Sequence, residues 1–318
     1  MKKRSYKQLF TGIILLSALV FAATHYSEFT RFVLLLRRIS PAWLFGALFL
    51  QLGTYVALAL VWYRTLRSEG VRYKLRRLIP LSVAKLFTDK AVPSGGISGI
   101  AFMFNALRKQ NVPEGICMKV MLTDIFSYYS AYILAAIGAL FVLWQHHDIR
   151  KWMVVVAAIF VTVAFIIPGA VLFLKQLGAN DRLPAWILKI PRIAPLLAIW
   201  SEVPQDPEHK PKLRPLLFIE VTMYQASVFF LDTLTLWAML QALGEPVSVF
   251  IAFPCLVFAS MVSMLSPIPL GLGTFEAVCA GLLIMFEIKV ETALTATLLL
   301  RGFTLWLPML PGLFVTRF

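Results

Sequence analysis

Long apolar runs are the feature that most restricts what this chain can fold into. Runs of about 20 residues or more recur along it, among them 41–63, 117–144 and 215–242. Such runs predict membrane-spanning helices, because about 20 consecutive apolar residues cross the hydrocarbon core of a bilayer. Only 14% of the residues are charged, against roughly 25% in soluble proteins. We therefore predict an all-α polytopic membrane protein with a single integral membrane domain over residues 1–318.

The apolar runs fall into two kinds. Six predict full crossings, at 9–24, 41–63, 117–144, 152–174, 215–242 and 292–315. The first follows the basic segment MKKRSYKQ, so a cleaved signal peptide is the alternative, but we favour a retained helix because the topology needs it. Two further stretches, 79–107 and 248–286, are too long for one tidy span. Each is interrupted in its middle, by AVPSGGISG and by SPIPLGLG.

Positive charges alternate between the links that join these runs. Lys and Arg are dense in the N-terminal segment and in links 64–78 and 175–214, and Arg108 and Lys109 follow the first interrupted stretch. The other links carry few, with 25–40 as the exception. The positive-inside rule then predicts that both termini are cytoplasmic. This topology requires two re-entrant hairpins, the first entering from the cytoplasmic side and the second from the opposite side.

The formal net charge of +14 is carried by the same links. On a soluble protein such a charge would indicate nucleic-acid binding. Here the basic residues lie beside apolar runs, where they set topology and attract anionic lipid headgroups. We expect membrane lipids as partners and no nucleic acid.

The two halves of the chain resemble each other in order. Residues 1–148 and 149–318 both read as helix, link, helix, interrupted hairpin and long helix, starting on opposite sides of the membrane. Pro93-Ser94-Gly95 corresponds to Pro269-Leu270-Gly271, and Asp124 and Arg301 follow these loops at nearly equal spacing. Inverted repeats with broken helices near the midplane are a recurring transporter construction. We therefore predict two inverted-topology repeats.

The interrupted loops are candidate binding elements. Non-helical backbone at membrane depth is tolerated only where protein buries it or water reaches it. The short helices that leave the loops begin near Ser98 and Thr274, and helix N-termini suit an anion such as a lipid phosphate. The alternative is that the loops are ordinary Pro/Gly kinks. The loop residues proposed for substrate binding are Pro93, Ser94, Gly95, Gly96, Pro269, Gly271 and Gly273.

Ionisable residues inside the apolar runs are the second set of candidates, because a charge in a membrane span is costly and functional by default. They are Lys85, Asp89, Lys90, Asp124, Glu220, Asp232, Glu276 and Arg301. Of these, we assign Lys85, Asp124, Glu276 and Arg301 to the substrate site. A buried salt bridge that fixes packing is the alternative for Asp124 and Arg301, and snorkelling to the cytoplasmic surface is the alternative for Lys85.

Enzyme motifs are not found in the sequence, which has no P-loop pattern, no GxSxG and no HExxH. His146-His147-Asp148 lies in a short polar link, where metal binding is the less favoured interpretation. The cysteines lie inside apolar runs and are expected to be buried without disulfides: Cys117, Cys255 and Cys279. We expect no catalytic residue, cofactor or metal.

The loops and nearby charges resemble a known family. The chain is similar, over nearly its whole length, to the transmembrane, flippase-like region of lysylphosphatidylglycerol synthases. The resemblance is carried by Val92-Pro93-Ser94-Gly95-Gly96, Leu122-Thr123-Asp124, Pro267 to Glu276, and Leu300-Arg301. The sequence has Leu270 where the family usually has Gly. It also has Thr123 where Arg often precedes the Asp, which removes one headgroup contact.

The resemblance implies lipid handling in the cytoplasmic membrane of a bacterium or archaeon. In full-length synthases this region moves an aminoacylated lipid, which a separate soluble domain makes. The sequence stops at Phe318, directly after the last predicted helix, so we expect transport without synthesis. A non-catalytic scaffold or accessory subunit for a lipid- or glycan-modifying enzyme, and an enzyme subunit acting on lipid-linked sugars, are the alternatives. A partner enzyme and an oligomer are left open.

Overall fold

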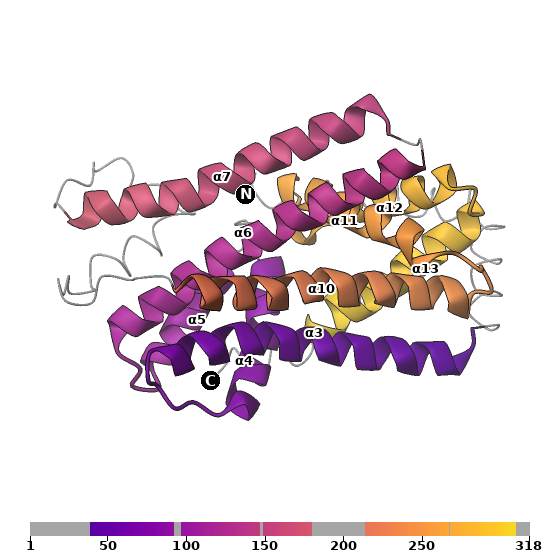
Figure 1. Ribbon diagram of the computed structural model, residues 1–318. Helices are drawn as coiled ribbons and strands as arrows, with labels where there is room; N and C mark the ends of the chain where they lie inside the picture. Colours follow the sequence, from indigo (N-terminus) through magenta and orange to yellow (C-terminus); the bar gives the residue numbers. More distant parts are fainter. Residues whose placement is uncertain (1–38, 92–96, 147–148, 180–213, 267, 310–318) are drawn as a thin grey trace, which may run out of the picture.

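The computed structural model describes residues 39–91, 97–146, 149–179, 214–266 and 268–309. Within these ranges every regular element is a helix (Figure 1). The long helices are α3 (Pro41–Ser68), α6 (Glu114–Gln145), α7 (Lys151–Ala179) and α10 (Pro215–Ala242). The shorter ones are α4 (Leu75–Ala91), α5 (Ile97–Arg108), α11 (Val249–Leu265), α12 (Thr274–Met285) and α13 (Val290–Arg301). A 3-10 turn, η2 (Pro269–Gly271), precedes α12, and a π-helical turn, η3 (Gly302–Trp306), follows α13.

The chain is an all-α polytopic membrane protein, as the sequence predicts. The four long helices are long and apolar enough to cross a membrane, and they coincide with the predicted crossings at 41–63, 117–144, 152–174 and 215–242. The predicted crossing at 9–24 lies outside the described residues. The run at 292–315 begins as α13 and continues through η3 as helix to residue 309. Among the described residues, the three cysteines are buried and free, as expected.

Helices α3 and α10 lie side by side as an antiparallel pair (Figure 1). At one end, the Ser40 amide donates to the Ala242 carbonyl at 3.4 Å. At the other end, Arg64 makes a bidentate ion pair with Glu220, with both N–O distances 2.7 Å. The Ser40–Ala242 hydrogen bond and the Arg64–Glu220 ion pair therefore hold the two helices together at both ends.

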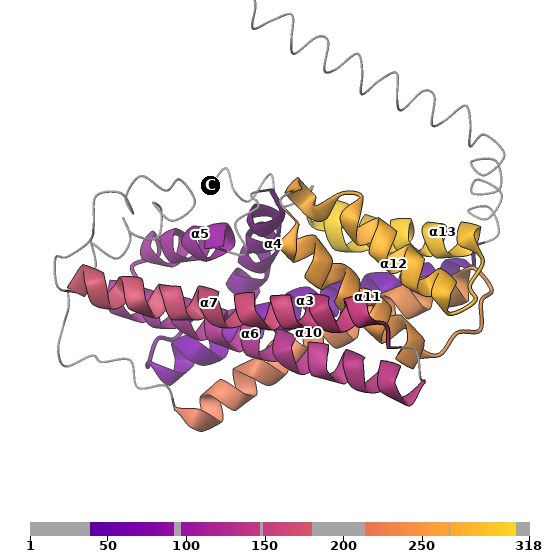
Figure 2. The same cartoon turned by 90° about the horizontal axis from the view of Figure 1, so that it is seen from above.

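Both interrupted stretches fold as helical hairpins whose outer ends lie together. Helix α4 packs against α5, and a hydrogen bond from the Tyr73 hydroxyl to the Gln110 side chain joins the links before and after this pair. Helix α11 packs against α12, and the hydroxyl of Thr292 in the first turn of α13 lies 3.5 Å from the carboxylate of Glu245 in the link before α11. Figure 1 and Figure 2 show the α4–α5 hairpin and the α12–α13 region toward opposite ends of the bundle.

The bundle is packed tightly inside and is apolar outside. Ala59 and Trp62 of α3 are fully buried, because helices in lipid associate through close packing rather than through a hydrophobic driving force. Large apolar side chains such as Phe49, Ile137 and Phe165 are exposed on the outer faces. These apolar outer faces suit contact with acyl chains. A site for a polar ligand is therefore expected inside the bundle.

Candidate functional site

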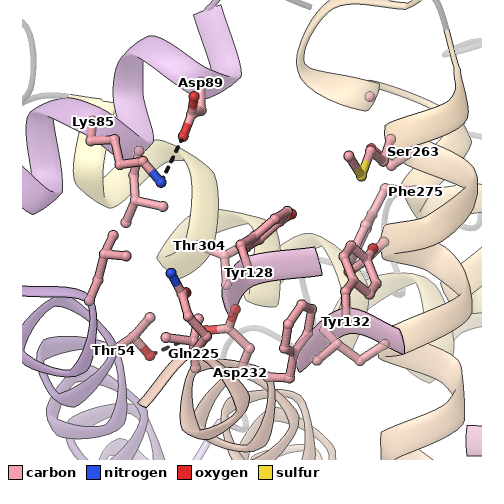
Figure 3. Close-up of a pocket in the computed structure, with 18 of the residues that line it drawn as sticks. Thr54, Lys85, Asp89, Tyr128, Tyr132, Gln225, Asp232, Ser263, Phe275 and Thr304 are labelled. Atoms are coloured by element: carbon pink, nitrogen blue, oxygen red, sulfur yellow. Dashed lines mark hydrogen bonds and ion pairs between the residues drawn. The ribbon is translucent and has the colours of Figure 1, made fainter. Parts of the chain in front are cut away.

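A cavity of about 260 Å³ lies inside the bundle, between elements of both halves of the chain. Side chains of α3, α4, α6, α10 and α11 line it, together with the loop at η2, Phe275 of α12 and Thr304 of η3. Figure 3 shows Lys85, Asp89, Tyr128, Gln225 and Asp232 around one open space. Three of the residues assigned to the site from the sequence also line it: Lys85, Asp124 and Gly271.

A buried ion-pair network occupies one wall of the cavity. The Lys85 Nζ lies 3.0 Å from Oδ2 of Asp124 and 3.5 Å from Oδ2 of Asp89. The Lys85 and Asp124 side chains are only 7% and 4% exposed, so Lys85 does not snorkel to the surface. The Gln225 side-chain amide donates to Oδ1 of Asp124 at 2.9 Å. Because burying these charges is costly, the hydrogen bond and the two ion pairs are needed to offset their desolvation.

Asp89 also binds a backbone amide in the first turn of helix α5. Its Oδ1 accepts a hydrogen bond from the Gly99 amide at 2.8 Å, and the Ser98 hydroxyl donates to the Thr88 carbonyl at 3.0 Å. A Cβ at residue 99 would lie 2.3 Å from Oδ1 of Asp89, so the close approach requires glycine. A carboxylate from within the chain thus already binds at this helix N-terminus. The loop residues Pro93, Ser94, Gly95 and Gly96 lie outside the described residues.

Glu276 and Arg301 hold the second loop in place. Glu276 accepts from the Gly273 amide at 2.7 Å and from Arg301 Nε at 2.8 Å. Arg301 also donates to the Leu270 carbonyl at 2.5 Å, and its guanidinium carbon lies 5.0 Å from the centroid of the Phe275 ring. Leu270 and Gly273 have positive φ, 62° and 83°, so the loop is sharply turned. Residues 268–273 therefore form a tight turn that includes η2, and its Leu270 carbonyl and Gly273 amide are bound by the buried Arg301 and the partly buried Glu276.

The four charged residues assigned to the site from the sequence form two separate ion pairs. Asp124 pairs with Lys85, and Arg301 pairs with Glu276, so each lies in the kind of buried salt bridge given above as the alternative. Phe275 and Leu270 line the cavity. Glu276 follows Phe275 in the chain, and Arg301 binds the Leu270 carbonyl, so this ion pair is adjacent to the cavity. Glu220 binds Arg64 at the end of the α3–α10 pair. Pro269 lies in η2, and Gly273 is the residue before α12.

A second polar part of the cavity wall contains Asp232, which was not assigned to the site from the sequence. Asp232 lines the cavity, and the Thr54 hydroxyl donates to its Oδ1 at 3.4 Å. Gln51 and Gln225 line the cavity as well. Residues 225 and 232 are seven positions apart and therefore share one face of α10, a spacing that would have identified this wall.

Aromatic side chains form a third part of the lining. The ring centroids of Tyr132 and Phe229 lie 4.6 Å apart, and those of Tyr128 and Tyr132 lie 5.7 Å apart. Tyr132 also contacts Phe160 of α7, at 4.3 Å between centroids. Rigid rings of this kind give a cavity a fixed shape with both apolar faces and hydroxyl groups.

Comparison with known families gives one match. The model of the family described as lysylphosphatidylglycerol synthase TM region matches residues 9–312. A search among curated proteins finds no match.

Proposed function

Because the chain belongs to the family of lysylphosphatidylglycerol synthase TM regions, we propose that it is a lipid transporter of the flippase type. It moves the headgroup of a phospholipid or polyprenyl-phosphate lipid between the two leaflets while the acyl or prenyl chains stay in the bilayer. The proposal includes no catalytic step: the chain handles a lipid that another protein makes.

The observation that carries this proposal is the polar cavity inside an apolar bundle. Ionisable groups within membrane-spanning segments are costly, and they mark substrate or ion pathways. Asp124 lies about 15 Å along α6 and Arg301 a similar distance along α13, so both lie at membrane depth. Charges, amides, hydroxyls and aromatic rings together surround one shared space in the bundle, as a substrate path would require.

We further propose that the two halves, 1–148 and 149–318, are inverted repeats and that both hairpins are re-entrant. The antiparallel α3–α10 pair supports this, as do the reciprocal contacts of α10 with α6 and of α3 with η3. The position of the hairpins toward opposite ends of the bundle supports entry from opposite sides of the membrane (Figure 2). Transport would then follow from rocking of one repeat against the other.

The lipid phosphate is assigned to the two loops and the rest of the headgroup to the cavity. At the second loop, Pro269, Gly271 and Gly273 are the assigned residues, while Glu276 and Arg301 hold the shape of the loop. At the first, Pro93, Ser94, Gly95 and Gly96 are the assigned residues. Lys85 and Asp124 are assigned to contacts with the headgroup inside the cavity.

Lipid scrambling in proteoliposomes tests the proposal. Fluorescent phosphatidylglycerol, a polyprenyl-phosphate lipid and a glycolipid are supplied separately, and transfer between leaflets is measured for wild type and for Glu276→Ala. We expect at least one lipid to move, and its transfer to fall about tenfold in the variant, because loss of a charged hydrogen-bond partner releases the loop. Glu287→Ala, which removes an exposed carboxylate, is the matched control.

A folded protein that moves no lipid would exclude transport. Co-purification with a lipid- or glycan-modifying enzyme would then favour the scaffold or accessory-subunit alternative. Folding is checked from the elution profile and thermal unfolding in detergent.

A further inference from the structure

The charge of the cavity limits which headgroups it can take. Its ionisable lining includes one lysine and three aspartates, Lys85, Asp89, Asp124 and Asp232, an excess of two carboxylates. The Lys85 ammonium already lies between Asp124 and Asp89, at 3.0 and 3.5 Å. A second anion inside this low-dielectric space would be repelled, since charge interactions strengthen as the dielectric constant falls. The interior therefore disfavours a phosphate or a carboxylate.

Uncharged hydrogen-bonding side chains make up the rest of the polar lining. Ser260 and Ser263 on α11 and Ser266 directly after it follow one another at three-residue spacing and line the cavity together. Across the open space lie Gln51 and Thr54 of α3 (Figure 3 shows Ser263 and Thr54 on opposite sides). Gln51 is 2% exposed, and among the described residues its Oε1 has no hydrogen-bond partner. An ammonium group needs a few acceptors gathered at one point. In this cavity the donors and acceptors are spread over several helices, which matches a ligand with many hydroxyl groups.

The aromatic wall fits the same ligand. Tyr128, Tyr132 and Phe229 present flat apolar surfaces, and the two tyrosines add hydroxyl groups. A sugar ring has apolar C–H faces and a polar edge, so it can pack on an aromatic ring and bind polar side chains at its rim. The volume, about 260 Å³, is below the roughly 300 Å³ at which sites for drug-sized ligands begin. It therefore suits one compact headgroup and excludes the lipid tails.

We propose that the cavity takes an uncharged polyhydroxyl headgroup, such as the sugar of a glycolipid, and that Asp232 determines this specificity. The inference rests on the proposed lipid transport. An ionised carboxylate only accepts hydrogen bonds, so Asp232, held by Thr54 at 3.4 Å, binds hydroxyl donors and repels anionic headgroups.

The test compares three labelled lipids in proteoliposomes: a glucosyl diacylglycerol, phosphatidylglycerol and lysylphosphatidylglycerol. We expect the glucosyl lipid to move fastest. Asp232→Asn lowers the ratio of glucosyl-lipid to phosphatidylglycerol transfer by about tenfold, because it removes a charged acceptor and the repulsion of the anion together. A variant that only weakens the fold would slow both lipids and leave the ratio unchanged. Glu287→Gln, an exposed carboxylate far along the chain from α10, is the matched control.

The outcomes separate this inference from the proposed function. Transfer of phosphatidylglycerol or lysylphosphatidylglycerol without the glucosyl lipid would overturn the inference and leave lipid transport standing. If Asp232→Asn leaves the transfer ratio unchanged, Asp232 does not determine the headgroup specificity. If none of the three lipids moves with folded protein, this inference is wrong, and transfer of the polyprenyl-phosphate lipid then decides whether lipid transport itself stands.

Discussion

At the residue scale, Gly271 is the position in the second loop with the least room for change. Its φ is +60°, and a Cβ there would lie 1.7 Å from the Ser263 Oγ. Gly271→Ala therefore imposes backbone strain and displaces Ser263, and we expect it to lower the free energy of unfolding by about 1–3 kcal/mol. Thermal unfolding in detergent measures this loss. Gly281→Ala on α12, where a Cβ meets nothing within 4 Å, is the control and should leave the Tm unchanged or slightly raised.

The sequence identifies individual charged residues better than it identifies their partners. Lys85, Asp124, Glu276 and Arg301 stand out because each places a charge in an apolar run. Their pairing into two separate ion pairs depends on which helices pack together, and no local pattern encodes that. Asp232 was not assigned to the site for the same reason, since its hydrogen-bond donor Thr54 belongs to a helix in the other half of the chain.

At the scale of the elements, the Lys85–Asp124 ion pair attaches the α4–α5 hairpin to α6. Lys85→Met leaves two nearly buried carboxylates without their cation, so we expect a loss of about 3–5 kcal/mol of stability. Lys85→Met combined with Asp124→Asn should recover part of that loss, because the uncompensated charge is removed. Thermal unfolding of the two single variants and the double variant gives the coupling energy. Additive losses would show that the pair does not hold the hairpin.

The positions of the long helices can largely be predicted from the sequence, whereas the irregularities within and between helices are harder to predict. The apolar runs predict α3, α6, α7 and α10 closely, because length and composition alone decide whether a helix can cross a bilayer. Pro and Gly predict the interruption before α12, where Leu270, Gly271 and Gly273 adopt positive φ. The π-turn η3 directly after Arg301 was not predicted. It has no compositional signature, although such turns are frequent at functional sites.

At the scale of the whole molecule, the arrangement of the hairpins makes a prediction about sidedness. Arg72 and Gln110 are exposed residues before and after the α4–α5 hairpin, and Pro246 and Lys289 are exposed residues before and after α11–α12. If both hairpins are re-entrant, the members of each pair lie on one side of the membrane, and the two pairs lie on opposite sides. Single cysteine substitutions at these positions, treated with a membrane-impermeant maleimide in intact cells and in opened cells, report the side of each residue. The background should be low, because the described native cysteines are buried.

We expect Pro246→Cys and Lys289→Cys to react in intact cells, and Arg72→Cys and Gln110→Cys to react only after the cells are opened. This orientation follows from the basic residues in the links around the first hairpin, which the positive-inside rule places in the cytoplasm. Labelling of the two members of a pair from different sides would mean that the hairpin between them crosses the membrane. The loop of that hairpin would then lie within a single broken span, and entry from opposite sides, on which the inverted-repeat transport scheme depends, would be excluded.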